Sequence, residues 1–550
     1  MASRRRVRTA SGATAVQIVE YVGGNEYVVV AHVGSAHTAA DLAVLWVRAG
    51  EMLHHEGQGV LDLGDDYLIP RVELVSPAAE RALFAMPAAP KLSRSAVAAG
   101  MRLISTGSRD LYNALACVYD DLGYNELMDP VFWDLVISWV VEQRSLRKAH
   151  RAIEALGMPT VSESTVRRTM KRVVAENYRD RIADLNFEHV MARGDVSLCL
   201  YDVTSVPTHC EEERDVQKVG FSKSRSIDPQ IVVGLLVDRR GFPLEIDAFA
   251  GNTAEKNTIL TIIEQFRSRH GLDDMVVVAD AGMLSAKVLT SLDDLGFWFI
   301  VGARNTKGPY DLESHFRWNG EVIKDGTVID TVTAKIGTKP VDNDPMVRCE
   351  PVWDPKTMPS SWRAVWVYSR KRFVRDSRNL TKQEDKARAV VAGQKAARSP
   401  RFVTTKGSAL VVNENALAKA RKMAGLKGFL TNMPASVMPA AEIVSSYHDL
   451  WEVERSFRMF KSDLATAPMH VWSERSIQAH ITRSFAALAI AREVQARTGL
   501  AIANVIDQLE QLRHATIQIN GNTAVVRPDI SPAQQAILDA IYQHDTKPTT

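Results

Sequence analysis

The sequence lacks any apolar run long enough to cross a membrane. A spanning helix needs about 18 or more consecutive apolar residues, and stretches such as 231–237 are far shorter. The arginines Arg4 to Arg6 are not followed by an apolar segment, so no secretory signal is predicted. We therefore expect a cytoplasmic protein with no membrane partner.

Cysteine and excess charge are also scarce. The four cysteines in 550 residues show no CxxC spacing, which excludes a disulfide scaffold and favours reduced thiols. His209 and Cys210 are adjacent, but no second ligand pair follows at zinc-finger spacing, so we expect no zinc there. The formal net charge is only +2. Any binding to nucleic acid must therefore come from local basic patches.

What the sequence does contain is typical of a globular protein with several parts. Hydrophobic residues make up 46% of the chain and charged residues 24%, which is the usual range. A chain of 550 residues exceeds what one hydrophobic core can hold. We expect three or more structural units.

The first 95 residues predict a small α+β unit. Residues 18–22 and 27–33 are rich in β-branched side chains, and the Gly-Gly-Asn sequence at 23–25 predicts a turn between two strands. A helix is expected over 39–53. The Pro- and Ala-rich residues 85–90 indicate a linker.

Helical periodicity dominates residues 96–190 and suggests a DNA-binding region. A basic helix is predicted over 145–156, a turn over 157–159, and a second helix from Ser162. This second helix carries the basic residues Arg167, Arg168, Lys171 and Arg172, of which the first three are the candidates for DNA contact. A helix-turn-helix and a solvated basic face are both compatible with this pattern.

Strands replace helices after residue 190. The predicted order is three strands in a meander, a helix, a strand, a helix and a strand, which is the order of a ribonuclease-H-like fold. The expected strands are 197–204, 230–238, 243–250, 275–280 and 298–302, with helices at 254–269 and 285–295.

These patterns divide the chain into six expected segments. They are an α+β unit (1–95), a helical region (96–190), the first part of a mixed α/β core (191–304), a β-rich insertion (305–425), the second part of that core (426–500), and a C-terminal helix and tail (501–550).

Two aspartates occupy positions suited to a metal site. Asp202 lies inside the first predicted strand of the core and Asp280 ends the fourth. If these strands are neighbours, the carboxylates approach each other, and a hard cation such as Mg²⁺ or Mn²⁺ would relieve their repulsion. An aspartate at a strand end is also a common turn residue. Asp280 considered alone therefore fits a structural role as well as a catalytic one. Asp202 is more unusual, because a carboxylate inside an apolar strand is costly unless it is paired.

A third carboxylate, Glu454, lies on a predicted helix over residues 447–461. Ser446 and Asp449 predict its capping box. Tyr447, Glu454 and Lys461 are seven residues apart, so at about 100° per residue they share one helical face. An amphipathic helix with a solvated charged face is the alternative interpretation.

Three motifs together resemble the DDE transposases of bacterial insertion sequences, in the branch with a Tyr-Arg-Glu-Lys signature and a β-rich insertion. The motifs are Leu200-Tyr-Asp-Val-Thr followed by Gly220-Phe-Ser-Lys-Ser and Asp228-Pro-Gln, Gly251-Asn-Thr-Ala-Glu-Lys-Asn-Thr with Val278-Ala-Asp-Ala-Gly, and Tyr447, Glu454 and Lys461 at the family's spacing. The likeness spans about residues 195–480. The signature's arginine would fall at 450, where this chain has Leu450, so Arg455 or Arg458 would have to supply its phosphate contact.

The resemblance implies a function and a set of partners. Asp202, Asp280 and Glu454 would be both the catalytic residues and the ligands of two Mg²⁺ or Mn²⁺ ions. Tyr447 and Lys461 match positions that contact phosphate near the cut. The enzyme would bind the terminal inverted repeats of its element as a homodimer on paired ends, cleave the DNA and join it to target DNA. It would be associated with the nucleoid.

Two alternatives remain open from the sequence. One is a ribonuclease-H-like DNA nuclease that cuts without joining. The other is a non-catalytic DNA-binding protein derived from a transposase, against which the three carboxylates argue.

Overall fold

A computed structural model describes most of the chain. The described residues are 2–8, 14–23, 26–36, 74–75, 101–143, 145–194, 198–210, 212–220, 228–272, 275–280, 285–396, 401–406, 409–519 and 522–542. The chain forms two compact units, Met1–Arg71 and Val72–Thr550. Among the described residues, no helix has the length and apolar character needed to traverse a lipid bilayer.

The first unit contains a three-stranded antiparallel sheet. Strands β1 (Ala2–Arg8), β2 (Thr14–Gly23) and β3 (Glu26–Ala36) are hydrogen-bonded in that order. The predicted pairing of residues 18–22 with 27–33 is confirmed as the β2–β3 hairpin. The polar, arginine-rich β1 was not predicted. The expected helix at 39–53 and linker at 85–90 lie outside the described residues.

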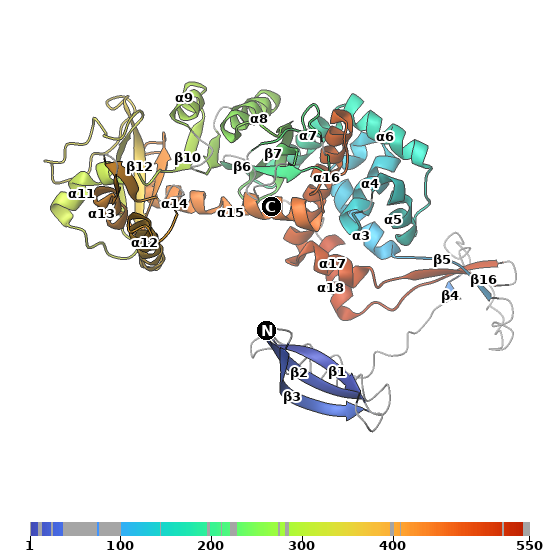
Figure 1. The fold of residues 1–550 in the computed structure, drawn as a ribbon. Coiled ribbons are helices and arrows are strands. Elements are labelled where there is room, and N and C mark those ends of the chain that lie inside the picture. The colour runs from blue at the N-terminus through green and yellow to red at the C-terminus, as the bar shows by residue number, and fades with distance from the viewer. Residues whose placement is uncertain are drawn as a thin grey trace. The chain divides into compact units, whose positions relative to one another are not determined.

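An eight-stranded mixed sheet forms the centre of the second unit (Figure 1). Its strand order is β11-β12-β15-β10-β9-β6-β7-β8. The bounds are β6 (Leu198–Pro207), β7 (Gln230–Asp238), β8 (Pro243–Ala250), β9 (Val276–Ala279), β10 (Trp298–Gly302), β11 (Val328–Ala334), β12 (Ser361–Tyr368) and β15 (Leu426–Thr431).

The five strands predicted for the core occur in the predicted order. β6, β7 and β8 form an antiparallel meander, and β9 and β10 add to β6 in parallel. Every residue of β7 is buried, as expected for a strand covered on both faces. Helices α8 (Glu255–His270) and α9 (Ala286–Asp294) provide the predicted crossovers. This arrangement is consistent with the predicted ribonuclease-H-like order of strands and helices.

The segment expected as a β-rich insertion contains more helix than strand. Its helices are α10 (Gly308–Asp311), α11 (Glu313–Asn319), α12 (Arg370–Val391) and α13 (Glu414–Lys422). Its strands β11 and β12 extend the main sheet, because β12 pairs with the otherwise open edge of β15. Among the described residues of the segment, the short hairpin of β13 (Val403–Lys406) and β14 (Ala409–Val412) is the one β element separate from that sheet. The prediction of a β-rich insertion was therefore wrong, because the described helices of this segment contain more residues than its strands.

A helical region packs against one end of the sheet. Its helices are α3 (Arg109–Asp121), α4 (Pro130–Val141), α5 (Ala149–Ala155), α6 (Glu163–Ala175) and α7 (Tyr178–Met191). The long helix α16 (Glu474–Thr498) is almost entirely buried between these helices and β8. Apolar side chains from the sheet and from this region form one continuous core.

The C-terminal segment is more than the expected helix and tail. Helices α17 (Ile502–Leu509) and α18 (Pro532–Tyr542) flank a hairpin of β16 (His514–Ile519) and β17 (Asn522–Val526). This hairpin pairs with β5 (Met101–Gly107) and β4 (Leu74–Val75) in a four-stranded sheet. The pairing joins segments about 400 residues apart, which explains why local patterns did not predict it.

Candidate active site

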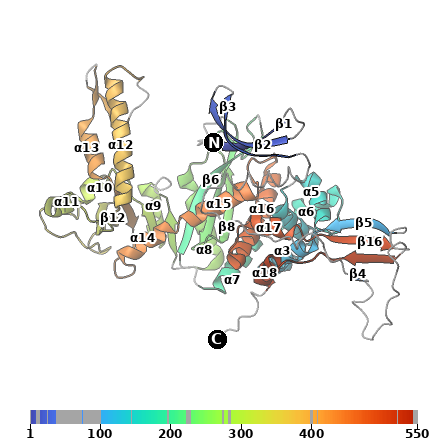
Figure 2. The same cartoon turned by 90° about the horizontal axis from the view of Figure 1, so that it is seen from below.

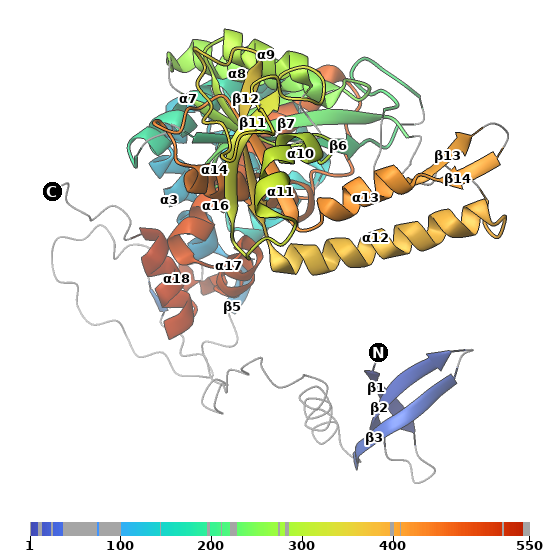
Figure 3. The same ribbon diagram turned by 90° about the vertical axis from the view of Figure 1, so that its left-hand side faces the viewer.

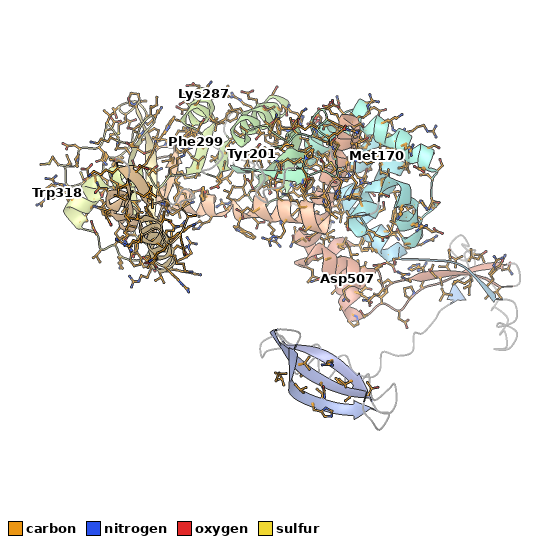
Figure 4. The ribbon with its side chains drawn as sticks, in the orientation of Figure 1. Met170, Tyr201, Lys287, Phe299, Trp318 and Asp507 are labelled. Atoms are coloured by element: carbon orange, nitrogen blue, oxygen red, sulfur yellow. The ribbon has the colours of Figure 1, made fainter. Side chains whose placement is uncertain are left out.

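Asp202 and Asp280 lie at matching positions of two adjacent parallel strands. Asp202 lies within β6 and Asp280 directly follows β9. Leu200 on β6 pairs with Val278 on β9, and each aspartate lies two residues beyond that pair. Because side chains alternate along a strand, both aspartates follow the same face as this pair. Figure 4 labels Tyr201, which directly precedes Asp202 on β6. Asp280 is exposed and Asp202 is half-buried.

The predicted single helix over 447–461 is interrupted. Helix α14 (Ala440–His448) ends before Asp449, and α15 (Trp451–Arg458) is followed by a π-helical turn at Met459–Asp463. The Asp449 carboxylate accepts a hydrogen bond from Arg239 of the β7–β8 turn at 2.7 Å, within the interruption. Ser446 is buried inside α14, and the first helix begins after Pro439, so the predicted capping box was wrong.

The interruption still leaves Tyr447 beside Asp280 and within electrostatic reach of Glu454. The Tyr447 hydroxyl donates a hydrogen bond to Oδ1 of Asp280 at 2.8 Å. Burial raises the pKa of Tyr447 far above its usual value, and the negative charges of Asp280 and Glu454 raise it further. The phenol therefore stays protonated and acts as a donor. Asp280 and Glu454 share this one tyrosine as a neighbour.

Lys461 approaches the same strand from the π-helical turn. Its ammonium donates a hydrogen bond to the backbone carbonyl of Ser205 at 2.8 Å, three residues after Asp202 on β6. Arg458, at the end of α15, is exposed. α15 packs on β6 and β7, so the helix and the strand ends place these basic groups and the carboxylates in one region.

Two further basic residues in this region were missed by the sequence analysis. The Lys427 ammonium on β15 lies 4.9 Å from the centre of the Tyr447 ring. Burial lowers the pKa of Lys427, the positive charge of Arg372 lowers it further, and Asp280 opposes this effect. Arg372 lies in the first turn of α12 and also acts on Tyr447. The available signal was a lysine inside an apolar strand, the same anomaly that singled out Asp202.

The donor set suits a hard cation, although the carboxylates are not gathered into a complete cage. Within the described parts of the chain, no three His, Cys, Asp or Glu side chains lie close enough together to hold a metal ion. Asp202 accepts a hydrogen bond from the Val203 backbone, and Asp280 accepts one from Tyr447. Carboxylate oxygens are the ligands that Mg²⁺ and Mn²⁺ prefer. Binding would require Asp280 to turn from the phenol toward the cation.

The basic residues of the predicted DNA-binding region lie on helix α6 (Glu163–Ala175). Helix α6 begins after Ser162 as predicted, and it packs chiefly on α4, α7 and α16. Arg167, Arg168 and Lys171 are exposed on the face opposite its buried residues. Arg172 differs from them, because its guanidinium binds the buried carboxylate of Asp129 with Nε at 3.0 Å.

The sequence of the core matches a known family. Residues 194–490, just over half of the chain, match the family described as "Transposase DDE domain". The chain belongs to this family. The match covers the strands and helices that carry Asp202, Asp280 and Glu454.

Comparisons with solved structures give more distant likenesses. The chain is similar to the piggyBac transposase in its synaptic complex with hairpin DNA, with 9% identity, a TM-score of 0.32 and coverage of 73% of this chain and 70% of that one. It is also similar to the Mos1 transposase in a paired-end complex with the left transposon end, with 10% identity, a TM-score of 0.14 and coverage of 28% and 53%. No curated protein matches the chain.

Proposed function

We propose that this protein is a metal-dependent DNA transposase whose catalytic residues are Asp202, Asp280 and Glu454. The observation that carries the proposal is the Tyr447 hydroxyl, which binds Asp280 and also neighbours Glu454. Asp202 lies on the adjacent strand β6, at the position that matches Asp280. In this proposal, residues from three distant parts of the chain would act together at the end of the sheet, where α/β proteins commonly bind ligands.

The three carboxylates would hold Mg²⁺ or Mn²⁺, two ions per active site. When bound, such ions activate the attacking oxygen and stabilise the charge on the phosphate and the leaving oxygen. The residues of this chain position those reactants. Asp202 on β6 and Asp280 after β9 would hold the cations from two adjacent strands, and Glu454 would hold them from α15.

Basic groups and a phenol around these carboxylates would hold the DNA strand. Lys461, Arg458 and Lys427 supply positive charge for the phosphates next to the scissile bond, and Tyr447 supplies a hydroxyl donor. The hydrogen bond from Lys461 to the Ser205 carbonyl on β6 holds the ammonium group in a defined position. Positioning of the phosphate accounts for much of catalysis in phosphoryl transfer.

The substrate would be the terminal inverted repeats of an insertion sequence. Arg167, Arg168 and Lys171 on α6 would contact the repeats at a distance from the cut. A homodimer would hold two ends together, and each freed 3′-hydroxyl would attack target DNA. Inverted repeats flanking the coding region would identify the substrate directly.

Asp280→Ala tests the catalytic assignment. We expect the variant to lose cleavage of DNA ends in Mg²⁺ by at least about 1000-fold, since a metal ligand is removed. DNA affinity should change by less than about threefold, because phosphate contacts come from other residues. The measurement is cleavage and joining of labelled repeat-end duplexes, together with a binding titration.

Asp294→Ala is the matched control, because this aspartate is exposed at the end of α9. It should cleave like the parent protein. Cleavage that survives in Asp280→Ala would refute the active-site assignment. Cleaved ends without joined products would instead indicate a nuclease without strand transfer.

A further inference from the structure

The segment from α12 to α13 carries a large local excess of positive charge. Residues 370–422 contain fifteen lysines and arginines against four aspartates and glutamates, a net charge of +11. The whole chain has a net charge of only +2, which leaves −9 for all other residues. We call residues 370–422 the basic arm. Figures 2 and 3 show its helices α12 and α13 side by side, with the hairpin β13–β14 next to them in Figure 3.

The basic residues of α12 form a stripe along one face. Lys371, Arg375, Arg378, Lys382 and Lys386 are all exposed. Their spacings of four, three, four and four residues keep them within about 80° of one another at about 100° per residue. The stripe is about 22 Å long at about 1.5 Å per residue.

Most of this charge is not neutralised within the protein. Among the described residues, no carboxylate forms an ion pair with Lys371, Arg378, Lys382 or Lys386. Arg375 differs from these four, because it pairs with Asp376, which also contacts Arg372. Glu384 binds Arg388 at 2.7 Å and also binds Arg421.

The opposite face of α12 is anchored, so the stripe is held on a defined surface. Leu380 and Ala387 pack with Phe402, Leu417 and Ala424 in a small hydrophobic core that belongs to the arm itself. The Ser369 side chain caps the helix by accepting from the Arg372 backbone. A helix fixed in this way loses little entropy when its exposed face binds a partner.

We propose that the stripe on α12 binds the phosphate backbone of double-stranded DNA. A regular row of exposed cations, four of which form no ion pair among the described residues, fits a polyanion with regularly spaced charges. Its length of about 22 Å corresponds to about six base pairs at about 3.4 Å per step. No base-reading side chains are needed for this contact. The stripe would therefore bind DNA without regard to sequence.

The base of the arm connects this surface with the proposed active site. Arg372, one residue from the start of the stripe, acts electrostatically on both Tyr447 and Lys427. DNA along α12 would thus lead toward the carboxylates. This placement rests on the proposed function, whereas binding of DNA by the stripe does not.

The triple variant Arg378→Ala, Lys382→Ala and Lys386→Ala tests the proposal in the full chain. The probe is a 30-base-pair duplex of arbitrary sequence, titrated by fluorescence anisotropy between 50 and 300 mM NaCl. We expect affinity to fall by at least about tenfold at 100 mM salt. The slope of log K against log salt should become shallower by about 2 to 3, at about 0.9 per lost phosphate contact.

The triple variant Lys287→Ala, Lys324→Ala and Lys356→Ala is the matched control. It removes the same charge from exposed lysines outside the arm, and Lys287 is visible on α9 in Figure 4. Its affinity and salt slope should equal those of the parent. Lys382→Ala alone should shift the slope by about 0.9, which gives a second measurement with minimal change to the helix.

Equal DNA affinity of the arm variant and the control variant would overturn the proposal. It would also be overturned if the arm variant lost binding to polyglutamate but not to DNA, because the partner would then be an acidic protein. Loss of DNA binding together with no cleavage by the parent protein would support the arm and refute the transposase proposal. The two conclusions can therefore fail separately.

Discussion

At the scale of single residues, Tyr447 connects the parts of the proposed active site. Its hydroxyl donates to Asp280, its ring contacts the Lys427 ammonium, and Glu454 adds negative charge nearby. A phenol that neighbours two proposed metal ligands competes with a cation for at least one of them. The tyrosine would thus set the carboxylate in place before the metal and the DNA arrive.

Tyr447→Phe should tighten Mn²⁺ binding by about tenfold or more. A hydrogen bond to a charged group contributes about 1.5–3 kcal/mol, and its loss would leave Asp280 available to the ion. Cleavage at saturating Mn²⁺ should fall, since the phosphate loses a donor. The measurement is calorimetric titration of the full chain with MnCl₂. Tyr310→Phe is the control, because that hydroxyl binds Lys419 in the insertion, and unchanged Mn²⁺ affinity in Tyr447→Phe would contradict the prediction.

At the scale of elements, the insertion is joined to the core through β11, β12 and α10. β12 pairs with β15 and thereby continues the main sheet. Asp311, at the end of α10, is completely buried against this extension. Burial raises the pKa of Asp311 to about 7, against the smaller opposing effects of Thr333, Lys307 and Trp366. A buried carboxyl group at this junction makes the stability of the insertion depend on pH.

Asp311→Asn should stabilise the protein above pH 7 but not at pH 4. Between the unfolded value of 3.8 and the folded pKa of about 7, the folded parent keeps a proton that the unfolded chain has lost. The stability of the parent therefore falls as pH rises through this window, by about 1.4 kcal/mol per pH unit, or about 4 kcal/mol at most. Asparagine has no proton to lose.

Urea unfolding of parent and variant at pH 4, 6 and 8 measures this difference. Glu313→Gln, an exposed change in the neighbouring helix α11, should show no such dependence. If the free energies of unfolding of Asp311→Asn and the parent differed by a constant amount across the pH range, the raised pKa of Asp311 would be disproved as the cause.

At the scale of the whole second unit, a buried ion network ties distant segments together. Glu493 on α16 binds Arg193, which follows α7, at 2.6 Å and Arg497 at 2.7 Å. Arg497 in turn binds Asp121 at the end of α3 at 2.6 Å. Glu493 and Arg497 are each almost fully buried. The helical region that carries α6 is thereby held to the helix that borders the catalytic core.

Glu493→Gln should destabilise the second unit by about 3–5 kcal/mol at pH 7. Removal of one partner of a buried ion pair is strongly destabilising, and the buried Arg497 would keep only Asp121 as a counter-charge. Burial alone would raise the pKa of Glu493, but hydrogen bonds from His189, Arg193 and Arg497 outweigh it and hold the pKa well below the usual value. The stabilisation is therefore present above about pH 4.5 and is lost as the pH falls toward the folded value.

The difference in the free energy of unfolding between variant and parent should accordingly be smaller at pH 4 than at pH 7. Thermal and urea unfolding at both pH values measure it. Glu188→Gln, an exposed change on α7, serves as the control and should be near neutral. A Glu493→Gln protein as stable as the parent at pH 7 would show that the network is not needed.

The sequence alone determined the order of the core strands and the positions of three carboxylates. Local apolar patterns are sufficient for this, because β7 and β9 are buried along their length, and in β6 Asp202 directly follows a buried apolar run. The tertiary structure alone decided which residues surround those carboxylates. Lys427 and Arg372 approach Tyr447 only because β15 returns to the sheet and α12 starts beside it.

The same distinction explains the remaining differences. The interruption at Asp449 depends on packing against the β7–β8 turn, and the pairing of β5 with β16 joins strands about 400 residues apart. Neither contact leaves a periodic signal within its own segment. Local side-chain patterns therefore specified the elements and their order, while long-range hydrogen bonds and burial specified the register, the break in the helix and the cations around the site.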